Sequence, residues 1–280
     1  MTHNNKMTLV AFTVFTAATT QVWTSQAHAQ AAAPVASAPA EVVNAAPTPA
    51  AHGASDDPNI DRGLLLPTAM TQPAGSVTYN NYELLLHGIT YGITDRVQGS
   101  VTVLSPIVKD MPFLGFAAVK GRIVSTERFN LALQGSVGWG HAFNSSDFNG
   151  GDAYTAGLGA FASYCLREDC SSLLSASATY QAAFPGSFSD RTDMVIYGGS
   201  IVHGVGRHFK LLGEVASAAG RGGSTNDISN IDGVLVGYGV RFHTDALAAD
   251  VGFLKPISGG TTDGDFIMGL PFASVSYRWQ

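Results

Sequence analysis

Ionisable side chains are rare in this chain and occur as small groups of mixed sign. Only 13% of the 280 residues are charged, about half the usual share in a soluble domain. Beyond residue 76, several of them lie in apolar, alternating sequence, where acidic and basic groups could pair with each other or line a narrow water-filled path. The candidates for such a lining are Glu83, His87, Lys120, Arg122, Lys210, Glu214, Arg241, Asp250 and Arg278.

Two cysteines, Cys165 and Cys170, are the next candidates for chemistry. They flank a tight break between two expected strands, where their Cβ atoms could approach disulfide distance. Two cysteines this close in an exported chain favour a disulfide, whose entropic stabilisation should be modest because the closed loop is short. Two thiols alone make a metal site improbable. We expect neither a metal nor a cofactor.

Two further patterns match the letters of binding motifs. Residues 157–162 (GLGAFA) match a dinucleotide-binding turn, but that motif needs a preceding strand and a following helix, and here it falls inside an expected strand. The segments 144–152 and 221–232 are rich in Asp and Asn, yet neither has the twelve-residue calcium-loop spacing with a closing Glu. We interpret the glycines as small residues of a barrel interior and the two segments as solvated loops.

The composition excludes several classes of protein. The net charge is −6 and no basic stretch is present, so we expect no nucleic-acid partner. The mean hydropathy of +0.14 is high, but no apolar run of about 18 residues follows the N-terminus, which argues against spanning helices. Thirty-two glycines and 10% aromatic residues favour strands and tight turns. Either a large soluble core or lipid-facing strands would fit.

The chain is expected to have three parts. Residues 1–29 resemble a secretory signal peptide, with Lys6 before an apolar core at 7–15 and a cleavage site at 27–29 (AHA). An inner-membrane anchor helix is the alternative for this segment. Residues 30–60 are rich in Ala and Pro and predict a disordered periplasmic linker. Residues 61–280 remain for one folded domain.

Alternating apolar and polar residues predict twelve strands in this domain. Tight breaks and longer polar loops alternate between them, as in transmembrane barrels, where the short turns face the periplasm. That alternation requires one strand before 76–93, and 62–70 (RGLLLPTAM) is assigned to it although Pro67 weakens its ladder. Both termini are then periplasmic. The strands are 62–70, 76–93, 96–106, 113–125, 129–143, 154–165, 171–184, 194–205, 208–220, 233–242, 247–256 and 266–279.

The strand at 129–143 shows which side chains should meet lipid. Leu131, Leu133 and Val137 share one face with the aromatic residues near the strand ends, while Gln134 and Ser136 share the other. Large rings at two heights favour the two water–lipid interfaces, so we expect the apolar face outward. A soluble barrel with its apolar face inward is the alternative.

The last residues, 273–280 (ASVSYRWQ), alternate in the same way. They resemble the closing strand of Gram-negative outer-membrane β-barrel proteins, which typically ends in an aromatic residue; here Trp279 is penultimate and Gln280 follows. The likeness covers the layout of residues 61–280 and names no single transport family. It implies a single up-and-down antiparallel all-β barrel in the outer membrane. Its partners would be membrane lipid, lipopolysaccharide, periplasmic chaperones and the barrel-assembly machinery.

Three functions are compatible with such a barrel. The first is a narrow pore for passive passage of small solutes, and the second is a closed structural or surface-interaction barrel without transport. The third is a hydrolase embedded in the barrel. No histidine in the domain is followed two residues later by serine, the H-x-S spacing associated with outer-membrane lipases and deacylases, so we expect that the chain is not an enzyme. Whether the lumen is open or filled depends on side-chain packing, and both alternatives stay open here.

Overall fold

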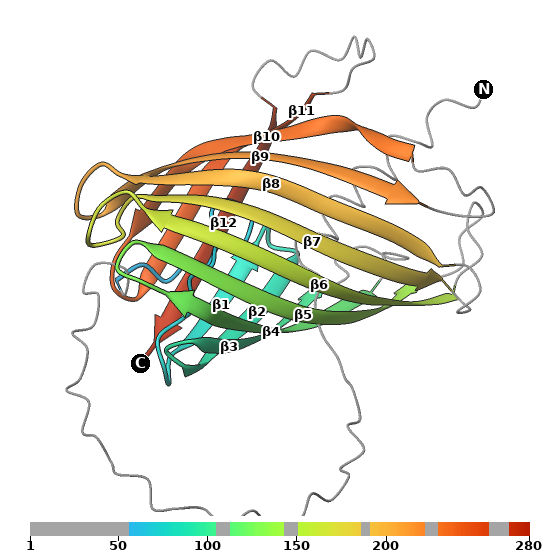
Figure 1. Ribbon diagram of the computed structural model, residues 1–280, viewed down its shortest axis with the longest axis horizontal. Coiled ribbons are helices and arrows are strands. Elements are labelled where there is room, and N and C mark those ends of the chain that lie inside the picture. The colour runs from blue at the N-terminus through green and yellow to red at the C-terminus, as the bar shows by residue number, and fades with distance from the viewer. Residues whose placement is uncertain (1–55, 105–112, 143–150, 186–190, 222–228, 258–268) are drawn as a thin grey trace, which may run out of the picture.

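The computed structural model describes residues 56–104, 113–142, 151–185, 191–221, 229–257 and 269–280. They form one closed barrel in which each strand pairs antiparallel with its neighbours in sequence, and β1 pairs with β12 (Figure 1). This confirms the predicted up-and-down barrel of twelve strands. The strands are β1 Val77–Tyr82, β2 Leu86–Thr94, β3 Val97–Leu104, β4 Phe113–Ser125, β5 Phe129–Ala142, β6 Gly151–Cys165, β7 Leu173–Pro185, β8 Thr192–Gly204, β9 Phe209–Arg221, β10 Ser229–His243, β11 Leu247–Ile257 and β12 Leu270–Trp279.

Period-two alternation gives the barrel wall two chemically different faces. In β5, Leu133 is 49% exposed on the outer face, whereas Gln134 and Ser136 are buried on the inner face. In β12, Val275 and Tyr277 are exposed outward, and Ser276 and Arg278 are buried inward. The apolar side chains therefore point away from the barrel axis and the polar ones towards it. A soluble barrel would have the reverse arrangement.

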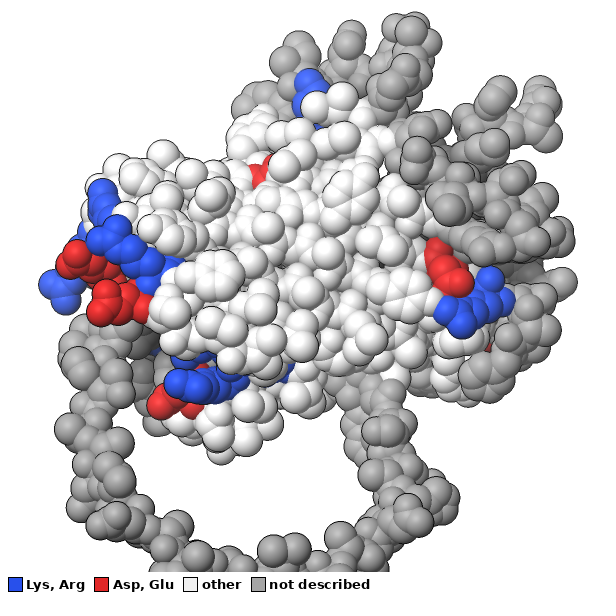
Figure 2. All heavy atoms as spheres, viewed as in Figure 1, with Lys and Arg blue, Asp and Glu red and all other residues white. Residues whose placement is uncertain are grey.

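One side of the outer surface has a wide band with few charges. Figure 2 shows one side of the molecule on which Lys, Arg, Asp and Glu gather towards the two ends and the middle is almost free of them. Such a belt, with exposed Leu158, Val215 and Val251, is the surface that hydrocarbon requires. No helix among the described residues has the length and apolar character needed to cross a membrane.

The two ends of the barrel differ in their connections. At one end, called the turn end, short links join β2 to β3, β4 to β5, β6 to β7, β8 to β9 and β10 to β11. At the other end, called the loop end, the connections after β3, β5, β7, β9 and β11 pass through segments outside the described residues, and only the β1–β2 link is short. The C-terminus lies at the turn end (Figure 1).

The expectation of a single strand at 76–93 was wrong. A tight turn at Glu83 and Leu84 divides it into β1 and β2, and both residues have positive φ, 53° and 63°. Asn81 lies just before the turn, and its side-chain oxygen accepts from the backbone N–H of Leu84 at 3.2 Å. This turn-forming residue was the sign of a break that the expectation overlooked. This division supplies the strand that the even count needs.

The expectation of a strand at 62–70 was also wrong. Residues 57–72, called the plug from here on, lie inside the barrel and contribute no strand to its wall. Within the plug, one isolated bridge joins Arg62 to Pro67, and the backbone N–H of Gly63 donates to the carbonyl of Leu66 at 2.8 Å. The run of three leucines therefore forms the tip of an internal loop.

Candidate functional site

The plug enters and leaves the lumen at the turn end. Its first residue, Asp57, lies beside Lys210 near the start of β9, and its last, Gln72, lies beside Gln98 near the start of β3. Between these points the chain passes towards mid-barrel, and its tip at Leu64–Leu66 meets Glu214 of β9. The lumen is thus filled in its turn-end half by the protein's own backbone.

A buried ion-pair network holds the entering limb of the plug. Asp57 accepts from the Lys210 ammonium at 2.7 Å and from the Arg241 guanidinium at 3.1 Å. Arg241 also pairs with Asp250, its cross-strand partner, at 2.7 Å, and Arg62 of the plug approaches Asp250 at 3.4 Å. All these side chains are at least 93% buried. Charges taken out of water this completely persist only when they are paired and hydrogen-bonded.

Backbone carbonyls of the plug complete the shell around Arg241. Its guanidinium donates to the carbonyl oxygens of Asn59, at 2.8 Å, and Gly63. Arg278 donates to the carbonyl oxygen of Asp57 at 3.5 Å. A guanidinium has five N–H donors in a rigid fork, and Arg241 uses them on the wall and the plug together.

The plug tip is held by a carboxylate of the wall. The backbone N–H groups of Leu64, Leu65 and Leu66 all donate to Glu214, with distances of 2.8 Å for Leu65 and 3.1 Å for Leu66. Three consecutive amides turned towards one point form an anion-binding nest. Gly63 is required beside it, because a Cβ at that position would lie 2.1 Å from a carboxylate oxygen of Glu214.

The returning limb of the plug is held by single polar side chains. Lys120 of β4 donates to the carbonyl oxygens of Asp61 and Thr68, each at 3.2 Å. Ser163 of β6 accepts from the backbone N–H of Ala69 at 2.8 Å. Gln98 of β3 accepts from the backbone N–H of Gln72 at 2.8 Å and donates to the Asp61 carboxylate at 2.9 Å.

The apolar side chains of the plug also have partners in the wall. Ile60, Leu64 and Met70 form one buried cluster with Leu173, Val202 and Leu212, with Phe272, and with the two cysteines. This cluster accounts for the apolar residues in 62–70 that suggested a lipid-facing strand.

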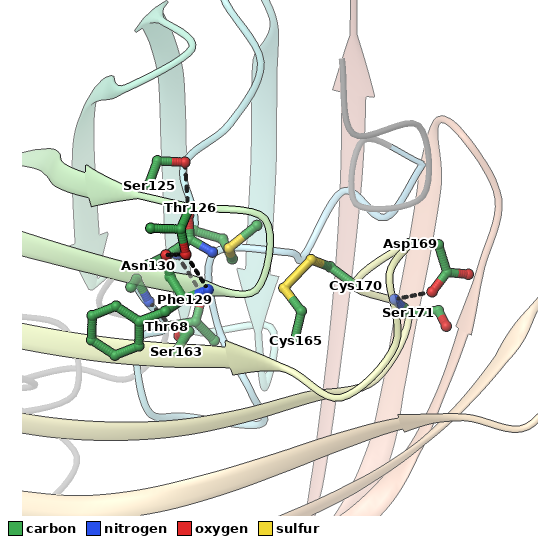
Figure 3. Close-up of a disulfide and its surroundings, with 12 residues drawn as sticks. Thr68, Ser125, Thr126, Phe129, Asn130, Ser163, Cys165, Asp169, Cys170 and Ser171 are labelled. Atoms are coloured by element: carbon green, nitrogen blue, oxygen red, sulfur yellow. Dashed lines mark hydrogen bonds between the residues drawn. A yellow bond between two sulfur atoms is a disulfide. The ribbon is translucent and has the colours of Figure 1, made fainter. Parts of the chain in front are cut away.

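The disulfide lies at the turn end, beside the plug. The structure joins Cys165 and Cys170 with an S–S distance of 1.98 Å, and Figure 3 shows the bridge across the link between β6 and β7. In the same link, the backbone N–H of Ser171 donates to the Asp169 carboxylate at 3.0 Å and lowers the pKa of that exposed group. The bridge fixes a turn whose buried sulfur atoms contact the plug cluster.

The structure brings most of the candidate charged residues together around the plug rather than along a water-filled path. Lys120, Lys210, Glu214, Arg241 and Arg278 contact the plug directly, and Asp250 reaches Arg62 and Asn59. Arg122 lies at the turn end, where it donates to the carbonyl oxygen of Asp95 at 2.6 Å.

Two candidates are not on the inner wall. Glu83 lies in the turn between β1 and β2, where it accepts from the backbone N–H of Ala273. His87 lies on the outward face of β2, where its ring bonds to the Tyr79 hydroxyl at 2.7 Å. On the same strand, Ile89 and Tyr91 share this outward face with His87. The apolar residues Ile89 and Tyr91 set the orientation of β2. His87 is on the same face of the strand and therefore also points outward.

Sequence reasoning missed the plug's own functional residues. Asp57 was placed in the disordered linker and Arg62 in a wall strand, and the polar wall residues Gln98 and Ser163 were not considered. One signal was available: Asp56, Asp57, Asp61 and Arg62 form a charged group directly before the domain, opposite in overall sign to the basic residues expected inside the barrel. The first 55 residues, which include the expected signal peptide and most of the linker, lie outside the described part of the chain.

Comparisons with known proteins identify no family. No protein-family model matches the chain and no curated protein matches it. Among solved structures, the chain is similar to a loop L8 deletion mutant of OmpT, an outer membrane protein of Vibrio cholerae, with a TM-score of 0.41 and 14% identity over 69% of this chain. It is also similar to the NanC porin, with a TM-score of 0.40 and 11% identity over 72% of this chain and 97% of that one. The chain spans 62% of the OmpT mutant and 64% of OmpT itself.

The closed twelve-stranded wall, with apolar side chains facing outward and polar ones facing inward, is the architecture of an outer-membrane β-barrel protein.

The prediction that the chain is not an enzyme was wrong as an exclusion. It rested on one missing spacing motif, and the similar outer-membrane barrels include OmpT. A fold of this kind is compatible with catalysis, because activity depends on a site and not on the barrel that carries it. Among the described residues, no group of three or more His, Cys, Asp or Glu side chains could hold a metal ion.

Proposed function

We propose that this protein is a gated pore, in which the plug closes the lumen at rest and small solutes pass when the plug is displaced. The turn end faces the periplasm, so the plug closes the periplasmic mouth. The observation that carries the proposal is the placement of residues 57–72 inside the wall, held by Lys120, Lys210, Glu214 and Arg241.

The way the plug is attached supports displacement rather than permanent filling. Its backbone bridge is internal, between Arg62 and Pro67, and the contacts described above that hold it to the wall run through side chains. It can therefore leave without opening any strand pair of the barrel. Both of its ends lie at the turn end, so it can move out through one mouth as a single loop.

The test is the electrical conductance of the full chain in planar lipid bilayers. Asp57→Asn removes the carboxylate between Lys210 and Arg241 and leaves their charges buried without it. Removing one partner of a buried pair costs about 3–5 kcal/mol, and the plug avoids that cost by leaving the lumen. We expect the open-channel probability of Asp57→Asn to rise at least a hundredfold over that of the unaltered protein.

Glu168→Gln is the matched control, since Glu168 pairs with Arg128 on the exposed turn-end surface and not with the plug. Its conductance should equal that of the unaltered protein. Heat-modifiable gel mobility verifies that each variant has a folded barrel. A folded Asp57→Asn variant that stays closed would favour the closed structural barrel and count against the pore.

A further inference from the structure

The barrel wall is lower on one side than on the other. β1 and β2 have 6 and 9 residues, whereas β6 and β10 have 15 each. With a rise of about 3.4 Å per residue and a tilt of about 40°, β1 reaches about 15 Å along the barrel axis and β6 about 40 Å. The apolar band of an outer membrane is about 25 Å tall. The turn between β1 and β2 therefore ends within that band.

The turn carries Leu84 at its tip, beside Glu83, whose carboxylate accepts from the backbone N–H of Ala273. Leu84 is 75% exposed and has a φ of 63°. An exposed leucine in a strained turn is poorly suited to water but well suited to hydrocarbon. The low wall therefore brings the inner face of β2 and β3 close to lipid.

The inner wall is apolar in its loop-end half. Among the inward side chains that the structure describes, those with charge lie in the turn-end half, around the plug. Above them the inner face carries large apolar side chains, whereas the interior of a porin is usually polar. Six of these, from six different strands, are Leu86, Leu104, Phe116, Ile196, Leu235 and Phe272.

The plug tip forms an apolar floor below this wall. Leu66 lies against β8, where a Cβ on Gly198 would come within 2.8 Å of its side chain. Leu65 and Pro67, although they belong to a loop inside the barrel, are only half-buried. Leu65 packs against the buried cluster with part of its surface and leaves the rest accessible.

Polar side chains interrupt the apolar wall, among them Ser136, Thr155 and Gln181. Ser136 Oγ of β5 and Thr155 Oγ1 of β6 are buried without a hydrogen-bond partner. Both Phe116 and Thr155 lie over Gly138, since a Cβ there would be 2.4 Å from the Phe116 ring and 2.9 Å from Thr155 Oγ1. A buried hydroxyl without a partner carries a free-energy cost, which a ligand with one hydrogen-bonding group would remove.

We propose that the loop-end half of the lumen binds small apolar molecules that carry one hydroxyl or similar group, with Phe116 against the apolar part and Ser136 and Thr155 bonded to the polar group. This rests on the proposed function, because it names the class of solute that the gated pore admits. The low wall at β1 and β2 gives such molecules a path between the binding site and the lipid.

The test uses 2-(4-fluorophenyl)ethanol and the full, unaltered chain in phospholipid nanodiscs, followed by fluorine NMR. Binding to the protein appears as a saturable component above the linear partitioning into lipid. We expect saturation near one molecule per barrel, and no saturable component with 3-deoxy-3-fluoroglucose as a polar probe. Linear partitioning alone would overturn the proposal.

Substitutions locate the site. Phe116→Ala should weaken the saturable binding at least fivefold and Ser136→Ala at least threefold. Val101→Ala is the control, since Val101 is 53% exposed on the outer face of β3, and it should leave binding unchanged. Heat-modifiable mobility verifies folding, and Ser136→Ala, which removes one oxygen atom, keeps the test decisive if Phe116→Ala does not fold. Binding that is equal in all variants would place the probe elsewhere and refute the site.

A lipid acyl chain has the same apolar chemistry and is distinguished by mass spectrometry of the purified protein. Retained phospholipid that the probe does not displace would show that the site holds lipid and would refute the proposal. If the gated-pore proposal is wrong, the conductance experiment gives a different result. Asp57→Asn would then remain non-conducting, whatever the unaltered protein binds.

Discussion

Arg241 and Asp250 face each other across the β10–β11 pair inside the barrel, joined by two hydrogen bonds of 2.7 Å and 3.1 Å. Neither side chain has measurable exposure. The pair belongs to the wall, but the remaining donors of Arg241 point to the plug. The wall and the plug are therefore stabilised by one continuous set of contacts.

Arg241→Leu should destabilise the protein much more than the double replacement of Arg241 and Asp250 by leucine. The single change leaves the buried Asp250 carboxylate without its main partner, at a cost of about 3–5 kcal/mol, whereas removing a buried pair together is often close to neutral. Asp57 loses Arg241 but keeps Lys210 in both variants. The measurement is the urea dependence of heat-modifiable mobility in lipid vesicles. Equal losses for the single and double variants would contradict the pairing.

Gly63→Val should release the plug without breaking the wall. A Cβ at this position collides with the Glu214 carboxylate, so the nest at the tip cannot form. Release is measured with trypsin, because no Lys or Arg lies between Lys6 and Arg62 and Arg62 is buried when the plug is docked. Cleavage after Arg62 should accelerate at least tenfold. Gly135→Val is the control, since nothing lies within 4 Å of a Cβ there, and it should leave Arg62 protected.

Replacing both Cys165 and Cys170 by serine should have a modest effect. The bridge spans a sequence separation of 5, and closing so short a loop stabilises a protein by about 2 kcal/mol in the chain-entropy model. We expect a lower midpoint temperature in heat-modifiability assays but a barrel that still assembles. Reductant should lower the midpoint of the unaltered protein to a similar value and leave that of the double variant unchanged. A reductant effect on the double variant would have to arise elsewhere.

Leu158→Arg tests which surface meets lipid. Leu158 lies in the middle of β6 and is 68% exposed on the outer face. A charge at the bilayer midplane costs a barrel about 2–4 kcal/mol, and near the interface about 0–1 kcal/mol. Leu166→Arg, beyond the turn end of the same strand, should therefore be nearly neutral in a urea titration in vesicles. Similar losses at the two positions would argue against the lipid-facing belt.

The wall could be predicted from sequence because every strand has one lipid face and one inner face. Leu133 and Gln134, adjacent in β5, follow that rule and were placed correctly. Tight links such as the one at Thr94 and Asp95 could be predicted because they are short and polar. The end of β4 at Ser125 and the start of β5 at Phe129 also agree with the expectation.

The plug could not be predicted, because a segment inside a barrel has no lipid face and follows no period of two. Leu64, Leu65 and Leu66 look like part of a membrane strand, yet they form a tip whose amides bind Glu214. Pro67 was the available warning. The charged wall residues were found because they are rare, but their real partners in the plug lie more than fifty residues away in sequence.

The plug ends at Gln72 and β1 begins at Val77, which pairs with Trp279 at the far end of the chain. The pairing of β1 with β12, which closes the barrel, therefore lies directly after the plug in the sequence. If β1 and β12 pair first, the plug has to enter a closed barrel through its turn end. Asp57, Arg62 and their charged partners then lose their water during that entry. If the plug binds the sheet first, β12 pairs with β1 after the contacts of the plug have formed. The second order avoids a state in which these charged groups have lost water but have not yet paired. In that order, the insertion of β12 is the step that closes the barrel around the plug.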